Sequence, residues 1–314
     1  MFENLPEKVT IREVGPRDGL QNESQFIATP VKKEFIRRLV AAGLPHIEIT
    51  SFVNPKWIPG LADCAEIGKE FAQVPGTVTS ALVPNAKGLE GAKAAGLKEV
   101  SVFMSASESH NKANINKSIA ETLRIFEELI PQIRQAGLAV EGMVSVVCGC
   151  PYEGAVEPRK VVEIAKTLLR YGATAIGLGD TVGVGTPLQV KRLLDMVIPE
   201  VGKDRIRLHL HDTQGTAVAN AVAALELGVT HFDSSVGGLG GCPYAPGASG
   251  NVPTENLVYT LHGMGVKTGI DLHALLETGA WIQDQLGHPL PSNGLKAYLG
   301  RKVRAEQKAT AAAS

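Results

Sequence analysis

The sequence has few cysteines and no excess of either charge. Its 314 residues contain only 4 cysteines, too few for a disulfide framework, so we expect a reducing compartment. Lysine plus arginine number 31 and aspartate plus glutamate 32, which leaves a formal net charge of -1. Without a positive excess to hold a polyphosphate backbone, nucleic acid is disfavoured as a partner.

Long hydrophobic runs are also missing. No stretch approaches the roughly 18 apolar residues that a membrane-spanning helix needs, so no membrane partner is expected. The opening, MFENLPEKVTIREV, has acidic residues and no apolar run, which is not the pattern of a secretory signal. We therefore predict a cytoplasmic protein.

Its composition, with 44% hydrophobic and 20% charged residues, is typical of a globular protein, and its length fits two domains or one large barrel.

Eight short runs rich in β-branched residues predict strands. They occupy residues 9–14, 46–50, 77–83, 99–106, 140–147, 175–180, 205–212 and 231–236. Their starts are 22 to 41 residues apart, which brackets the ~30 residues of one strand, one crossover helix and their loops. The intervening segments have helical periodicity, as at Val31, Phe35 and Leu39, with Gly43 as a stop.

Several of these helical segments end in a glycine a few residues before the next strand, which indicates a repeated unit. Eight such units favour a TIM (β/α)8 barrel over a doubly wound sheet, which usually has fewer strands. We predict a single catalytic domain over residues 1–314, with the barrel at about 9–265. Extra C-terminal helices follow at about 266–300, and a frayed tail is expected at 301–314.

Reactive side chains fall at the C-terminal ends of the predicted strands, where TIM barrels have their active sites. His209 and His211 are two residues apart on one strand, so both rings face the same side. The pair could bind a metal or could be hydrogen-bonded core histidines. Asp18 and Asn251 at the same mouth favour the metal, since carboxylate and amide oxygens beside imidazole suit magnesium or manganese.

Two further acidic or basic groups lie at this mouth. Arg17 can hold a carbonyl oxygen that becomes an enolate, or can form an ion pair with Glu48 or Asp180, and both roles are compatible. Glu48 shares a strand face with His46 and Thr50, which indicates a supporting or catalytic carboxylate rather than a packing residue.

A glycine-rich segment over residues 237–247 predicts a mobile lid. It lacks the Lys-Ser/Thr of a phosphate-binding loop. Cys242 in this segment is predicted to act as an acid or nucleophile when the lid closes, the alternative being a cysteine with no role. The spacing of Cys148 and Cys150 fits neither a redox pair nor a zinc site, so no chemistry is assigned to them.

Four long motifs resemble the hydroxymethylglutaryl-CoA lyase family of metal-dependent TIM barrels. They are EVGPRDGLQNE (13–23), TSFVNPKWIPGLAD (50–63), HLHDTQGTAVAN (209–220) and VGGLGGCPYAPGASGNVPTE (236–255). The resemblance implies that a divalent metal, Mg or Mn, is bound by Asp18, His209, His211 and Asn251. It also implies that Arg17 stabilises the substrate carbonyl, that Cys242 is the lid acid, and that Glu48, Asp180 and Glu255 are supporting or catalytic residues.

The same resemblance implies a reaction and its partners. A small-molecule acyl-CoA, 3-hydroxy-3-methylglutaryl-CoA, would be cleaved to acetyl-CoA and acetoacetate, in leucine degradation, by a homodimer. His211, His209 and Asp18 all stay open as the proton acceptor, and Lys56, Asn54 and Asn85 are candidates for coenzyme A contacts. The alternatives are a lyase for a longer branched 3-hydroxyglutaryl-CoA in acyclic terpene catabolism, or a barrel that binds without catalysis.

Overall fold

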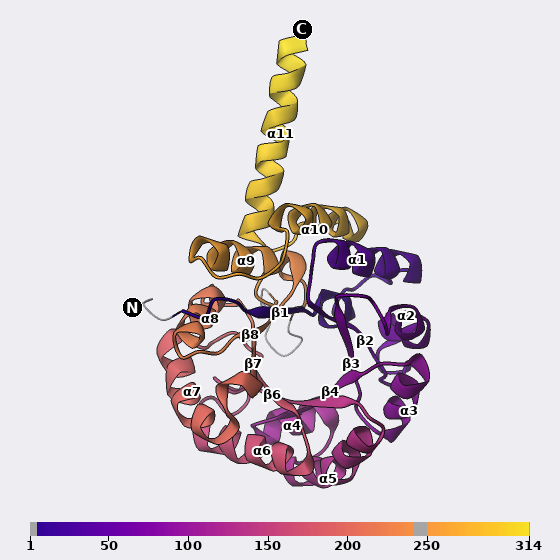
Figure 1. Ribbon diagram of the computed structural model, residues 1–314, viewed down its shortest axis with the longest axis vertical. Helices are drawn as coiled ribbons and strands as arrows, with labels where there is room; N and C mark the ends of the chain where they lie inside the picture. The colour runs from indigo at the N-terminus through magenta and orange to yellow at the C-terminus, as the bar shows by residue number, and fades with distance from the viewer. Residues whose placement is uncertain (1–4, 242–249, 314) are drawn as a thin grey trace.

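Eight parallel strands close into a barrel in chain order, β1 next to β2 and so on until β8 returns to β1 (Figure 1). The computed structural model describes residues 5–241 and 250–313. The strands are β1 (Thr10–Glu13), β2 (His46–Ser51), β3 (Val78–Leu82), β4 (Glu99–Ser105), β5 (Ala139–Ser145), β6 (Ala175–Asp180), β7 (Ile206–Leu210) and β8 (His231–Ser234). Each overlaps one predicted strand, and the predicted TIM barrel is confirmed.

Helices surround the barrel (Figure 1); those before β8 connect successive strands, and the last ones follow β8. They are α1 (Thr29–Ala41), α2 (Cys64–Phe71), α3 (Ala86–Ala95), α4 (Glu108–Ile115), α5 (Ile119–Gln135), α6 (Pro158–Tyr171), α7 (Pro187–Val201), α8 (Ala217–Glu226), α9 (Thr254–Gly263), α10 (Leu272–Leu286) and α11 (Asn293–Ala313). Four short helical turns, η1 (Gly15–Gly19), η2 (Pro59–Leu61), η3 (Lys203–Arg205) and η4 (Val236–Gly238), lie in loops. No helix among the described residues is long and apolar enough to cross a bilayer.

Helix α6 shows how the sequence pattern produces this packing. Val161, Ile164, Ala165 and Leu168 recur at helical spacing and are all buried. Burial of each of the three larger side chains, Val161, Ile164 and Leu168, contributes about 1.5–3 kcal/mol relative to exposure. The Leu168 side chain lies against Gly142 in β5, where an added Cβ would come within 2.8 Å of Leu168 Cδ1, so the glycine brings helix and sheet together.

The inner face of the barrel is charged rather than apolar. On β7, Leu208 and Leu210 belong to the apolar core, whereas Arg207 and His209 bond to acidic residues of other strands. Alternation along the strand therefore separates an apolar layer under the helices from a polar interior. This polar interior lies directly below the C-terminal mouth, where the reactive residues were predicted.

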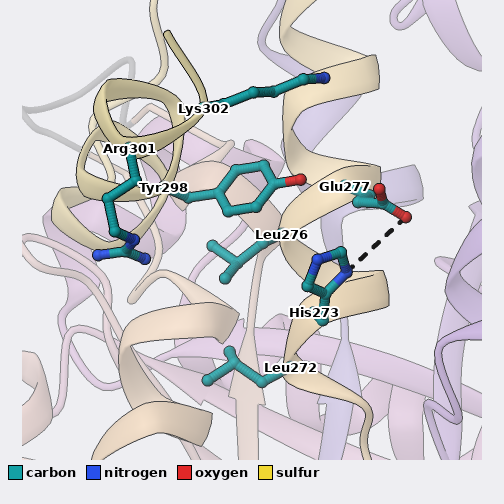
Figure 2. A pocket seen from close by; sticks show the side chains of 7 residues that line it. All are labelled: Leu272, His273, Leu276, Glu277, Tyr298, Arg301 and Lys302. Carbon is teal, nitrogen blue, oxygen red and sulfur yellow. Dashed lines mark ion pairs between the residues drawn. The ribbon is translucent and has the colours of Figure 1, made fainter. Parts of the chain in front are cut away.

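The C-terminal end departs from the prediction. Residues 301–313, expected to fray, instead continue α11, which projects away from the barrel beyond α9 and α10 (Figure 1). Alanine, lysine, arginine, glutamate and glutamine dominate this stretch, and their helix propensity is high enough to extend the helix although the side chains of residues 301–311 are exposed. Between α10 and α11 is a hollow of about 620 Å³, shown in Figure 2, which includes none of the predicted site residues.

Candidate active site

The turn after β1 presents Arg17 and Asp18 at the barrel mouth. The carbonyl of Val14 accepts hydrogen bonds from the amides of Arg17 (3.2 Å), Asp18 (2.8 Å) and Gly19 (3.2 Å), which closes one wide helical turn. Gly15 lies two residues after the end of β1, and a Cβ there would lie 2.5 Å from Glu13 Oε1. Glycine at this position lets the Glu13 carboxylate accept the Gly15 amide at 2.9 Å and brace the turn.

Arg17 and Glu48 form a largely buried ion pair at the mouth. Arg17 Nε donates to Glu48 Oε2 at 2.5 Å, and Arg17 Nη1 donates to Asp18 Oδ1 at 2.8 Å. The other oxygen of Glu48 accepts the Ser101 hydroxyl at 2.8 Å. Glu48 is thus the partner of Arg17, as one of the two sequence alternatives proposed, and it orients the guanidinium toward the mouth.

Asp18, His209 and His211 converge at this mouth. Each offers one ligand atom, and the three atoms lie within 4.8 Å of one another. The Nε2 atoms of the two histidines are 3.2 Å apart, close to the ~3 Å between neighbouring ligands of an octahedral ion with bonds of about 2.1 Å. The structure thus places the two rings and the Asp18 carboxylate, which the sequence predicted at one mouth, close together.

The surroundings keep two of these three residues, Asp18 and His211, in the forms that bind a cation. Burial alone would raise the pKa of Asp18, but Arg17 and the two histidines outweigh it and hold that pKa below its usual value. Burial, followed by the nearby His209, lowers the pKa of His211 to about 4, so its imidazole is neutral at physiological pH. Burial opposes protonation of His209 as well, yet its bond to Asp233 raises the pKa. A neutral imidazole and a carboxylate are the forms that bind metal.

Asn251 completes the donor set from the segment after β8. It forms an antiparallel bridge with His211, and its Nδ2 donates to Asp18 Oδ2 at 2.7 Å and to the Leu239 carbonyl at 3.0 Å. Its Oδ1 is buried and has no hydrogen-bond partner within residues 5–241 and 250–313. A buried amide oxygen without a partner is costly unless another ligand satisfies it, so the residues present fit a divalent cation.

Two other predicted carboxylates bond to loop backbones. Asp180, at the end of β6, accepts the amides of Gly185 (2.8 Å) and Val184 (3.3 Å), and burial raises its pKa. Glu255, in the first turn of α9, accepts the Gly237 amide with both oxygens at 3.1 Å. They support the loops beside the mouth and, within residues 5–241 and 250–313, form no hydrogen bond or ion pair with Asp18, His209 or His211. Cys242, the predicted lid acid, lies outside the described residues.

The candidate coenzyme A contacts have local roles. Asn54 Oδ1 accepts the amide of Lys56 at 3.0 Å, and Asn85 caps α3 by accepting the Gly88 amide at 3.0 Å. All three candidate side chains are exposed on loops that follow β2 and β3.

Sequence reasoning missed the charged residues below the mouth. Asp233 in β8 accepts His209 Nδ1 at 3.1 Å, and Arg12 in β1 bonds to both oxygens of Asp233, at 2.8 and 2.7 Å. Glu141 in β5 accepts a third bond from Arg12 at 2.7 Å. The only signal in the sequence is a charged residue inside each of three predicted strands, which is rare unless the charges are paired.

A closed (β/α)8 barrel with an aspartate, two histidines and an asparagine at its C-terminal mouth defines a class, the TIM barrels with a mixed nitrogen and oxygen cation site. The chain belongs to the HMGL-like family, whose model matches residues 8–282.

Named relatives agree with this assignment over most of the chain. The mitochondrial hydroxymethylglutaryl-CoA lyase of Bos taurus is 53% identical over 278 residues, which is 88% of this chain and 86% of the relative. A crystal structure of hydroxymethylglutaryl-CoA lyase from Pseudomonas aeruginosa is 47% identical with a TM-score of 0.92 and covers 96% of this chain and 100% of its own. An HMG-CoA lyase from Acinetobacter baumannii, in complex with coenzyme A and 3-methylmalate, is 38% identical with a TM-score of 0.89, covering 93% and 95%.

Proposed function

We propose that the chain is a divalent-cation-dependent carbon–carbon lyase that cleaves 3-hydroxy-3-methylglutaryl-CoA to acetyl-CoA and acetoacetate, with magnesium or manganese as the cation. The convergence of Asp18, His209, His211 and Asn251 beside the Arg17–Glu48 pair supports this proposal. The relatives described above, which are named for this lyase activity, support the substrate. Leucine degradation is the pathway in which we place the reaction.

The reaction requires that a tertiary alcohol lose its proton while the bond between C2 and C3 of the acyl chain breaks. C3 then becomes the ketone of acetoacetate, and the electron pair of the broken bond moves into the thioester enolate of acetyl-CoA. A divalent cation, when bound by Asp18, His209, His211 and Asn251, supplies Lewis acidity that lowers the pKa of the substrate hydroxyl and orients it.

The residues of the chain supply the remaining steps. Arg17, held by Glu48 and Asp18, faces the charge that develops on the thioester oxygen. Asp18, His209 or His211 accepts the hydroxyl proton. Cys242 gives a proton to the enolate carbon, which releases acetyl-CoA. Asp180 and Glu255 hold the loops that frame the mouth through their bonds to Gly185 and Gly237.

Three further features belong to this proposal. The acyl-CoA substrate is supported by the relative whose structure contains coenzyme A. A homodimer and a cytoplasmic location stay predictions from the sequence, the latter supported by the low cysteine content.

The test is acetyl-CoA release from 3-hydroxy-3-methylglutaryl-CoA with added Mg²⁺ or Mn²⁺, comparing the parent protein with His211→Ala and Cys242→Ser. We expect activity that needs the cation and falls sharply in both variants. A folded, metal-loaded parent that is inert would contradict the substrate, and a series of longer branched 3-hydroxyglutaryl-CoA thioesters would then identify the chain length. Full activity after chelation would contradict the cation.

A further inference from the structure

Asp233 is a buried acidic residue that the proposed reaction does not use. Its residue is 2% exposed, and it lies in β8 on the inner side of the barrel, below the mouth. Arg12 approaches it edge-on, with Nε on Oδ1 at 2.8 Å and Nη2 on Oδ2 at 2.7 Å. This two-pronged contact with a permanently charged guanidinium keeps the carboxylate ionised, so both oxygens of Asp233 can only accept hydrogen bonds.

The acceptor-only state of Asp233 determines the proton position on His209. Asp233 Oδ2 is 3.1 Å from His209 Nδ1, a distance at which one of the two atoms must donate. Since the carboxylate cannot donate, Nδ1 carries the hydrogen. In a neutral imidazole, Nε2 is then left with a free lone pair. That Nε2 atom is the one that faces His211 Nε2 at 3.2 Å, in the cluster with Asp18.

The support for Asp233 continues below it. Arg12 also donates to Glu141 Oε1 at 2.7 Å, and Glu141 Oε2 accepts from Arg207 Nε at 2.8 Å. Arg207 Nε also approaches Asp233 Oδ1, at 3.8 Å. Four charged side chains from β1, β5, β7 and β8 therefore form a closed, buried set in which the carboxylate has little freedom to rotate.

We propose that Asp233, clamped by Arg12, is a positioning residue that sets the tautomer and ring orientation of His209 so that Nε2 is available to a divalent cation. The inference rests on the cation of the proposed function. It assigns no bond-making role to Asp233, which acts only through His209. Partners of this kind typically change metal affinity about 10–100-fold when removed.

The experiment compares Mn²⁺ binding, by calorimetric titration, to the parent protein, Asp233→Asn and Glu141→Gln. Glu141→Gln is the matched control, because it removes one charge from the same set and also contacts Arg12, yet has no bond to His209. We expect the Mn²⁺ dissociation constant to rise about 10–100-fold in Asp233→Asn and to stay at the parent value in Glu141→Gln. Circular dichroism and thermal unfolding of each protein report any loss of structure separately.

If Asp233→Asn binds Mn²⁺ as tightly as the parent, the inference is overturned and the proposed cation is not. The same holds if both variants lose Mn²⁺ affinity equally, because the charged set would then act only through the stability of the barrel. A parent protein that binds no Mn²⁺ would overturn the proposed cation, and the inference with it. The two failures are therefore distinguishable.

A second measurement covers the case in which Asp233→Asn does not fold. Long-range ¹H–¹⁵N NMR of the ¹⁵N-histidine-labelled, metal-free parent, at alkaline pH where the imidazole is neutral, identifies the protonated nitrogen of His209. Comparison with His209→Gln assigns the signal. A hydrogen on Nδ1 supports the inference, and a hydrogen on Nε2 overturns it.

Discussion

Glu13 provides the sharpest prediction about pH. It is buried with no exposed surface, and its carboxylate joins three segments by accepting the amides of Gly15 and Val236, each at 2.9 Å, and the Thr254 hydroxyl at 2.6 Å. Burial raises the pKa of Glu13 from 4.5 to about 7, because these three bonds only partly offset the loss of hydration. The folded protein therefore keeps a proton that the unfolded chain loses above pH 4.5.

The sign of the effect follows from this proton. Between pH 4.5 and about 7 the folded state binds one proton more than the unfolded state, so the free energy of unfolding falls as the pH rises. At about 1.4 kcal/mol for each pKa unit, the loss from Glu13 alone is about 3 kcal/mol and is complete above pH 7. Glu13→Gln imitates the protonated carboxyl, since its amide oxygen can accept both backbone amides while its NH₂ donates to Thr254.

The assay is denaturant unfolding of the metal-free parent and Glu13→Gln, followed by circular dichroism at about pH 5 and about pH 8. We expect the variant to gain about 2–3 kcal/mol over the parent between these two conditions. Because His209 and the other titrating groups are common to both proteins, their contributions cancel in the difference. A parent-to-variant difference that is the same at both pH values would refute the buried, protonated Glu13.

Three further predictions concern the mouth of the barrel. Arg17→Lys should slow acetyl-CoA release about 10²–10³-fold, because an ammonium group cannot bond to Glu48 and face the substrate in the same way. A loss of activity below about tenfold in steady-state kinetics would contradict the role of Arg17. Gly250→Ala should cost about 1–3 kcal/mol in thermal unfolding, since φ is +95° and a Cβ would lie 2.5 Å from the Gly238 carbonyl oxygen. Gly60→Ala, with nothing within 4 Å, is its control, and equal midpoints for the two variants would argue against strain. Burial, and then Asp180, raise the pKa of the partly buried Cys148 thiol. Iodoacetamide should therefore modify it slowly at about pH 8 in the native protein and rapidly after unfolding, as peptide mass spectrometry would show, and fast native labelling would contradict the raised pKa.

Local sequence signals were sufficient for the barrel and for most of the mouth. The eight strands were predictable because β-branched runs and helix-ending glycines repeat at the spacing of one strand and one helix. His209 and His211 were predictable as a pair because strand alternation alone places two such rings on one face. The carbonyl ends of parallel strands then bring Asp18 to the same place.

The interior charges could not be predicted in the same way. Arg12 and Asp233 are 221 residues apart, and their pairing depends on the register by which β8 closes against β1. Asp180 and Glu255 were predictable only in part. The sequence indicated that Asp180 ends a strand and that Glu255 lies in a helix, but it did not indicate which loop amides they bind. The expectation that the C-terminal tail frays differs from the structure for another reason. Small polar residues suggested fraying, whereas their intrinsic helix propensity extends α11 to Ala313.

The hydrogen bond between Asp18 and Asn251 joins the two ends of the barrel sequence, which are 233 residues apart. During synthesis the chain emerges from its N-terminus, so Asp18 is exposed to solvent and to cellular metals long before its last partner has been made. A nascent or truncated chain that ends before Asn251 has at most three of the four donors. Tight cation binding would therefore appear only after Asn251 has been made, which makes metal loading a reporter of late synthesis as well as of folding.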